Sequence, residues 1–296
     1  MDNFLKPLAT RRTQRSLNST QCPLTTKTVY MTDSGEPVIG RDGPAAILPT
    51  SLSPNAQARS GRSGTRRFVL LADGRTGSTW LELLLDRHPD VVCEWEMLHG
   101  SLIDHSLCFS EKFPAHLDKT VWRKYSGFAA VGFRLLYEQC ATPDSDRTSF
   151  RPEVFRYFAT QALFIVHLVR RNVLNKLLSR KLAQRFQIFG GRPYPPTTLD
   201  ISPAELRHEI ERQARFLQTI AEQLDQQPTI AIYYEDLCAN TTRHLDVIFR
   251  FLGVRSVPVA VDFPKQRVRP QNEYIANYME LKASFVDTPH GWMFEV

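Results

Sequence analysis

The chain has 296 residues, of which 42% are hydrophobic and 23% are charged. This length allows one or two domains, and the composition is that of an ordinary soluble globular protein. No stretch approaches the roughly 18 consecutive apolar residues that a membrane helix needs, so we expect no integral membrane segment.

Five cysteines are scattered along the chain and never stand as a Cys-x-x-Cys pair. An odd and scattered set argues against a disulfide framework or a zinc site and favours a reducing compartment. We therefore expect a cytoplasmic protein without a bound metal.

The formal net charge of +6 is unevenly distributed. Residues 1–64 hold eight Lys and Arg side chains against four Asp and Glu, which gives +4 and leaves +2 for the rest of the chain. A DNA-binding protein more often concentrates its charge on the folded domain, so no nucleic acid is expected as a partner.

Residues 1–64 have the composition of a disordered N-terminal extension. They contain six prolines and many Ser and Thr, and their only aromatic residues are Phe4 and Tyr30. Such a segment cannot bury enough apolar area to offset the entropy of ordering it. A transit peptide is the alternative, because the segment contains Arg and Ser and few acidic residues.

From residue 67 onward, short apolar runs alternate with helical patterns. The runs predict five strands, at 67–72, 90–95, 127–136, 162–169 and 229–234. The helical patterns predict four helices, at 78–89, 172–189, 202–224 and 241–254. This alternation implies an α/β protein with a mostly parallel central sheet, covered by helices on both faces in three layers.

The first predicted strand leads through "DGRTGSTW", residues 73–80, directly into a helix. Such a turn puts free backbone N–H groups and the positive end of a helix dipole at one point. Arg75 adds a permanent charge that can hold an anion, and Ser78 and Thr79 add hydroxyl donors. The turn therefore predicts a phosphate or sulfate site, with a tight strand–helix turn that holds no ligand as the alternative.

The turn departs from the signature of nucleotide-dependent kinases and GTPases. Those proteins place Lys and then Ser or Thr after the second Gly, whereas Ser78 follows Gly77 directly here. We also find no clear apolar strand that ends in Asp and could supply a second magnesium ligand.

A second group of cations follows the predicted strand 162–169. Arg170 and Arg171 stand at its carboxyl end, and Ser179 comes eight residues after Arg171. Open α/β sheets bind ligands at the carboxyl ends of their strands. The two motifs together suggest two separated anion sites on one ligand.

Both motifs resemble those of the sulfotransferases that use 3′-phosphoadenylyl sulfate (PAPS). Residues 73–80 resemble the family's loop for the 5′-phosphosulfate, and "RRNVLNKLLS" (170–179) resembles its 3′-phosphate motif. "YYEDL" (233–237) is similar to a late strand–helix unit of the family, and residues 277–295 resemble the C-terminus of bacterial carbohydrate- and nodulation-type members. The resemblance covers roughly residues 67–296 and implies a P-loop-like fold, with 65–296 as the sulfotransferase domain.

The resemblance also implies a set of site residues. Arg75 would neutralise charge on the leaving phosphate and so act catalytically, without a metal ion. Trp80 stands at the place of an aromatic that stacks on adenine in the family's cytosolic members, and a Trp that packs in the core from the helix face is the alternative. For the 3′-phosphate, Arg170 and the segment of Arg267 and Arg269 are alternatives to Arg171. The implied PAPS-binding residues are Arg75, Thr76, Gly77, Ser78, Thr79, Trp80, Arg171 and Ser179.

A base must take the proton of the acceptor. Glu96 follows the predicted strand 90–95 and stands where the resemblance places the base of carbohydrate-type members. Glu94 and His99 are the other candidates.

The implied reaction transfers a sulfuryl group from PAPS to a hydroxyl and yields PAP, the nucleotide without the sulfuryl group, and a sulfate ester. A sugar or glycolipid hydroxyl is the preferred acceptor by resemblance, and a small-molecule alcohol is the alternative. Residues 97–160 are expected to supply much of the acceptor site. A nucleotide-dependent kinase of P-loop type and a nonenzymatic nucleotide- or polyanion-binding protein are the competing functions.

Overall fold

The computed structural model describes residues 30–31, 37–38, 64–96, 112–141, 150–190 and 192–295. Within the predicted N-terminal extension it describes two short antiparallel strands, β1 (Tyr30–Met31) and β2 (Pro37–Val38). The division into a disordered extension and one domain stays a prediction. His99, one of the candidate bases, lies outside the described residues.

Five parallel strands form the central sheet in the order β4-β5-β3-β6-β7. Their bounds are β3 (Arg66–Ala72), β4 (Val91–Glu94), β5 (Ala130–Leu136), β6 (Phe164–Val169) and β7 (Thr229–Tyr233). Each lies at a predicted position, and the prediction of an α/β protein with a mostly parallel sheet is confirmed. The strand that precedes the phosphate-type turn, β3, is central, so its carboxyl end has a neighbouring strand on both sides.

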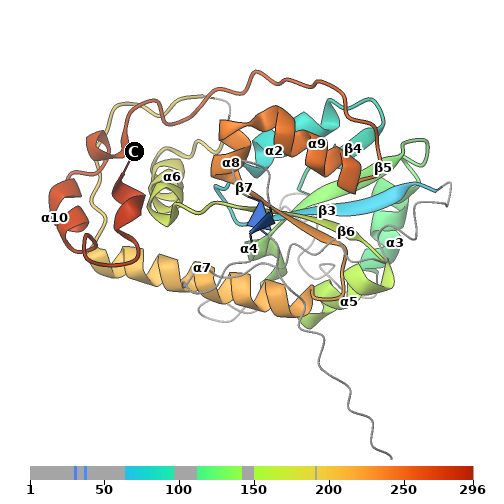
Figure 1. Ribbon diagram of the computed structural model, residues 1–296, viewed down its shortest axis with the longest axis horizontal. Helices are drawn as coiled ribbons and strands as arrows, with labels where there is room; N and C mark the ends of the chain where they lie inside the picture. Colours follow the sequence, from blue (N-terminus) through green and yellow to red (C-terminus); the bar gives the residue numbers. More distant parts are fainter. Residues whose placement is uncertain are drawn as a thin grey trace, which may run out of the picture.

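Helices cover both faces of the sheet (Figure 1). On one face lie α2 (Ser78–Asp86), α8 (Tyr234–Ala239) and α9 (Thr241–Phe251). On the other lie α3 (Phe113–Leu117) with the π-helix η2 (Asp118–Trp122), α4 (Tyr137–Cys140), α5 (Pro152–Thr160) and α7 (Pro203–Gln223). Strand β3 serves both layers, because alternate residues of a strand face opposite ways. Val69 and Leu71 belong to the apolar cluster on the α5 and α7 face, whereas Phe68 and Leu70 belong to the apolar cluster on the α2 and α9 face.

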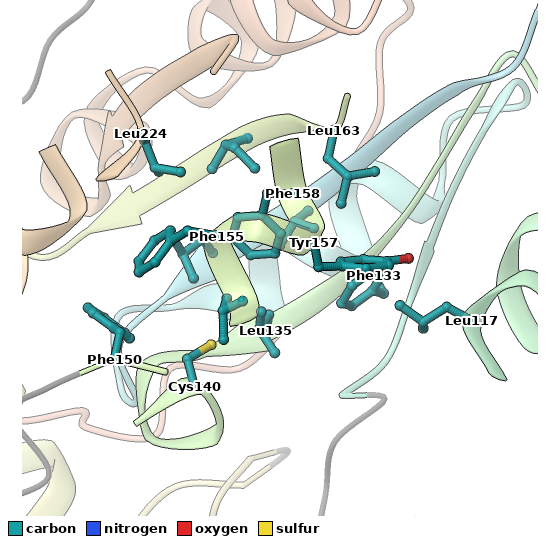
Figure 2. Packing of buried hydrophobic residues seen from close by; sticks show 14 of the residues in the cluster. Leu117, Phe133, Leu135, Cys140, Phe150, Phe155, Tyr157, Phe158, Leu163 and Leu224 are labelled. Carbon is teal, nitrogen blue, oxygen red and sulfur yellow. The ribbon is translucent and has the colours of Figure 1, made fainter. Parts of the chain in front are cut away.

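Aromatic side chains dominate the core on the α5 and α7 face. Figure 2 shows Phe133 and Leu135 of β5 packed among Phe155 and Phe158 of α5 and Leu224 at the end of α7. Buried apolar area of this kind is the main stabilising contribution in a folded domain. This packing stabilises the sheet, whose strands position the loops at its carboxyl edge.

A third apolar cluster joins helix α6 (Val173–Phe186) to the C-terminal part of the chain. That part contains η3 (Gln271–Glu273), α10 (Tyr278–Ala283) and η4 (Gly291–Phe294). Figure 1 shows α10 and the C-terminus beside α6, and the side-chain amide of Asn172 donates to the Met293 carbonyl over 3.0 Å. These contacts hold α6, the helix that carries Ser179, against the C-terminal part of the chain.

Side-chain caps explain where two of the helices, α6 and α7, begin. The side chains of Asn172 and Ser202 accept hydrogen bonds from the backbone N–H groups of Asn175 and Glu205, at 2.8 and 3.1 Å. Each bond satisfies a donor that the first helical turn leaves without a partner.

Candidate active site

The turn between β3 and α2 has the geometry of an anion-binding loop. Gly77 adopts φ 88 at the N-cap of α2, and no side chain caps that helix end. The first N–H groups of α2 therefore point out of the helix without an intrahelical acceptor. A Cβ at Gly77 would lie 2.5 Å from the Tyr234 ring, so only glycine fits between the turn and α8.

Arg75 extends from this turn toward α6 and the C-terminal part of the chain. Its Nε donates to Ser179 Oγ over 3.2 Å, and its two Nη atoms donate to the Phe189 carbonyl at 2.7 Å and to the Tyr194 hydroxyl at 2.8 Å. A further bond joins it to Gln266. All these acceptors are neutral, so the charge of Arg75 is not neutralised by any carboxylate of the described ranges.

The hydroxyl groups of the turn have different environments. Thr76 is buried and donates to the Asp73 carbonyl over 2.8 Å, so it stabilises the turn itself. Ser78 is also buried, at the first position of α2. Thr79 Oγ1 accepts a bond of 2.5 Å from Arg134 of β5. Trp80 is half-buried, and its ring meets that of Tyr234 edge-on with the centroids 6.5 Å apart.

Two more arginines surround the same place. Arg170, at the end of β6, donates to the Arg75 carbonyl over 3.1 Å and lies 4.7 Å from the centroid of the Tyr234 ring. Its Nε atom is buried and has no hydrogen-bond partner among the residues that the structure describes. Arg267 bonds to Asn175 of α6.

Neither Arg170 nor Arg267 forms an ion pair in the part of the chain that the structure describes. Burial lowers the pKa of Arg170, and burial together with the charge of Arg170 lowers the pKa of Arg267 to about 10. Three arginines without a counter-ion are an arrangement that an anionic ligand would stabilise. We call Arg75, Arg170 and Arg267 the arginine cluster.

Arg171 is not brought to the arginine cluster. Its guanidinium pairs with Asp236 and lies 3.9 Å from Glu235 Oε2, while its backbone N–H donates to Glu235 over 3.1 Å. Ser179 contacts Arg75, and of the two adjacent arginines it is Arg170 that contacts Arg75.

A buried ionic network connects Asp73 of the turn to side chains of α6 and α7. Asp73 accepts from Lys176 Nζ at 2.7 Å and from Arg212 at 2.8 Å, and it also accepts the Gly74 N–H at 2.8 Å. Glu209 of α7 pairs with Lys176 and with Arg212, at 3.2 and 2.8 Å. Burial would raise the pKa of Asp73, but Lys176 and its neighbouring arginines outweigh it and hold that pKa well below its usual range. The network ties the turn to α6 and α7.

Glu96 lies on the other side of the turn, in contact with Arg134. Its Oε1 accepts from Arg134 Nη2 at 2.6 Å, and its Oε2 accepts from Gln139 Nε2 at 3.1 Å. Because Arg134 also binds Thr79, the candidate base is linked to the predicted anion-binding turn through one buried guanidinium.

Glu94 faces elsewhere. Its Oε1 accepts from Lys124 Nζ at 2.9 Å and from the Tyr125 hydroxyl. Burial would raise its pKa, but these two hydrogen bonds outweigh that effect and lower it.

Sequence reasoning did not find Arg134 or Glu138. Arg134 is one charged residue inside an otherwise apolar strand that is buried throughout, and that isolation was the available signal. The carboxylate of Glu138 lies so close to the turn that a Cβ at Gly74 would be 3.3 Å from its Oε2. Desolvation by the surrounding protein, with the charge of Asp73, raises the pKa of Glu138.

Two absences concern the described residues alone. They contain no helix that is both long and apolar enough to cross a membrane. They also contain no group of three or more His, Cys, Asp or Glu side chains arranged to hold a metal ion.

The fold and the site define an α/β protein with a P-loop-like turn and an arginine cluster at the carboxyl edge of a parallel sheet. In sequence, the chain is 26% identical to nodulation protein H of Rhizobium meliloti over 254 residues, which cover 78% of this chain and 96% of that protein. The predicted resemblance to nodulation-type members of the sulfotransferase family is confirmed.

Solved structures of sulfotransferases are similar at lower identity. One from Alicyclobacillus acidocaldarius gives a TM-score of 0.45 at 15% identity, over 78% of this chain and 95% of that one. Mouse sulfotransferase SULT7A1 in complex with PAP gives a TM-score of 0.39 at 17% identity, over 66% of this chain and 60% of that one. No family model matches the chain.

Proposed function

We propose that this protein transfers the sulfuryl group of PAPS to a hydroxyl of an acceptor, yielding PAP and a sulfate ester. The observation that carries the proposal is the arginine cluster, whose three cations have no carboxylate partner among the described residues and adjoin an uncapped helix N-terminus. PAPS carries negative charge at both its 5′ and 3′ positions, as such a site requires.

The first N–H groups of α2 and the side chain of Arg75 would hold the 5′-phosphosulfate, together with Thr76, Gly77, Ser78 and Thr79. Ser179 would bind the 3′-phosphate, with Arg170 and Arg267 as its cations. Arg171 would have to leave Asp236 to reach the nucleotide. Trp80 is the proposed stacking surface for adenine, which is supported by its half-buried position beside Tyr234.

In the proposed reaction, the acceptor oxygen attacks sulfur in line, and the bond between sulfur and the 5′-phosphate oxygen breaks. Glu96 takes the acceptor's proton, and Arg75 with the N–H groups of the turn neutralises the charge that develops on the departing phosphate. The residues of the chain supply these cations themselves, so we propose a reaction without a metal ion.

For the acceptor, we propose a carbohydrate or glycolipid hydroxyl. The similarity to nodulation protein H supports this choice. Trp95, next to the proposed base, is 48% exposed, and an exposed indole offers an apolar surface for the flat side of a sugar ring. We also propose a cytoplasmic location.

Titration calorimetry with PAP, adenosine 5′-monophosphate and ATP with magnesium tests the nucleotide assignment. PAP is expected to bind at least about tenfold more tightly than the monophosphate, because a charge-assisted hydrogen bond contributes about 1.5–3 kcal/mol. A preference for ATP with magnesium would indicate a kinase instead. Tight PAP binding without sulfation of any acceptor would indicate a nonenzymatic nucleotide-binding protein.

A further inference from the structure

A second buried carboxylate, Glu82 of helix α2, faces the guanidinium that holds Glu96. Glu82 Oε2 lies 3.0 Å from Arg134 Nη1, and the same nitrogen is 2.5 Å from Thr79 Oγ1. Arg134 Nη2 lies 2.6 Å from Glu96 Oε1. Glu82 and Arg134 are 6% and 1% exposed, so solvent screens their interaction weakly.

The charges around this guanidinium do not balance. Glu82 and Glu96 each form their one ion pair with Arg134, as far as the described chain goes, so two carboxylates share one cation. Glu94 and Asp86 add negative charge from β4 and α2, and the buried thiol of Cys93 also faces Glu82. Glu138 of α4 adds a further carboxylate that interacts with Glu96, and Gln139 contributes only a neutral amide.

We propose that Glu82 is a positioning residue for the catalytic base, because it shares Arg134 with Glu96 and thereby sets the placement and the protonation of the Glu96 carboxylate. The inference rests on the proposed function, in which Glu96 accepts the acceptor's proton. It extends that function by assigning a role to a residue that contacts neither PAPS nor the acceptor in the proposed reaction.

The physical basis is competition for a single positive charge. When Glu82 is ionised, Arg134 is divided between two carboxylates, and the charge of Glu82 also opposes ionisation of Glu96. When Glu82 is protonated, the full charge of Arg134 stabilises the Glu96 carboxylate, which then holds a proton less readily. Burial, opposed by Arg134, raises the pKa of Glu82 to about 7. The change between a shared Arg134 and one that pairs with Glu96 alone therefore occurs near neutral pH.

The test replaces the Glu82 carboxylate by an amide of the same shape. In Glu82→Gln, the kcat profile is expected to lose the inflection near pH 7 that the titration of Glu82 produces, because Arg134 is then no longer divided between two carboxylates. PAP affinity should stay within about twofold of the wild type. Asp86→Asn is the matched control, because it removes the same charge from the more exposed end of α2 and should leave the inflection near pH 7 in place.

A second readout does not depend on turnover. In protein labelled with ¹³C at the glutamate carboxyl carbons, the Glu82 titration should move to lower pH in Glu96→Gln, because the charge of Glu96 contributes to the raised pKa of Glu82. The Glu96→Gln arm also provides the answer if Glu82→Gln does not fold.

The outcomes separate the two proposals. Coupled titrations in a protein that transfers no sulfuryl group would overturn the proposed function and leave the Glu82–Glu96 coupling standing. Normal transfer by the wild type with a Glu82 titration that Glu96→Gln does not move, or an inflection near pH 7 that Asp86→Asn removes as Glu82→Gln does, would overturn the inference.

Discussion

Arg75 Nε donates a hydrogen bond of 3.2 Å to Ser179 Oγ, although the two residues are 104 positions apart in the chain. One belongs to the turn that follows β3, and the other lies in the middle of α6. The resemblance to the sulfotransferases associates them with opposite ends of PAPS. Their contact brings the two predicted anion motifs together, and in the proposed function it allows Arg75 to respond to a ligand at either end.

Replacement of Arg75 by Ala should lower turnover much more than it lowers PAP affinity. Removal of a donor that stabilises developing charge costs about 10²–10³ in rate, because the charge is greatest when the bridging oxygen departs. Arg75→Lys keeps the charge and should recover part of the loss. Single-turnover rates and PAP calorimetry on both variants provide the comparison, and wild-type turnover in Arg75→Ala would remove this residue from the mechanism.

Arg170 and Arg171 should differ in their effect on the 3′-phosphate. The structure places Arg170 in the arginine cluster and pairs Arg171 with Asp236, so we expect Arg170→Ala to reduce the preference for PAP over adenosine 5′-monophosphate by about 10- to 100-fold. Arg171→Ala should change this preference by less than about threefold.

The two affinities are measured on each variant, with the affinity for the monophosphate as the internal control. A preference lost in Arg171→Ala and kept in Arg170→Ala would show that Arg171 leaves Asp236 when the nucleotide binds.

Gly77→Ala should damage the turn. Alanine at φ 88 costs about 1–2 kcal/mol, and its Cβ would also lie 2.5 Å from the Tyr234 ring. We expect PAP affinity to fall by at least about tenfold, since 1.4 kcal/mol corresponds to a factor of ten. Gly127→Ala is the matched control, because no atom lies within 4 Å of a Cβ built there. Equal PAP affinities in the two variants would count against the turn as the binding site.

The ionic network beneath the turn should make stability sensitive to acid. The hydrogen bond from Arg212 and the charges of Lys176 and Arg180 outweigh the effect of burial and lower the pKa of Glu209 from 4.5 to about 2. A carboxylate with a lowered pKa stabilises the fold above its unfolded pKa, and this contribution is lost as the pH falls from about 4.5 to about 2.

The contribution of Glu209 is on the order of 3 kcal/mol at pH 7. The free energy of unfolding in urea should therefore fall between pH 6 and pH 3 by more in the wild type than in Glu209→Gln. Glu211→Gln is the control, because Glu211 lies two residues further along α7 and is exposed. Parallel pH curves for the wild type and Glu209→Gln would show that the network does not act through this carboxylate.

The order of strands and helices could be read from the sequence because each element carries a local signal. "RFVLLA" is apolar between turns, and the caps at Asn172 and Ser202 are side chains that mark a helix start by themselves. The turn at Gly77 was equally visible, since strand, glycine and helix follow one another directly.

The partners of the site residues could not be read in the same way. Tyr194 and Gln266 meet Arg75 only because α6 and the C-terminal part of the chain pack together. The choice between Arg170 and Arg171 depends on which of two adjacent side chains finds Asp236, and spacing along the chain does not encode that. Arg134 lies within an apolar strand, where a pattern of hydrophobic residues conceals it.

The central claim, sulfuryl transfer with Glu96 as the base, is tested most directly by incubating the protein with ³⁵S-labelled PAPS and pooled glycan and lipid extracts. We expect a labelled sulfate ester with the wild type and with Glu94→Gln, whose carboxylate faces Lys124 and Tyr125. Glu96→Gln should form it about 10²–10⁴-fold more slowly while binding PAP normally. No labelled product from the wild type, or equal rates for Glu96→Gln and the wild type, would contradict the account.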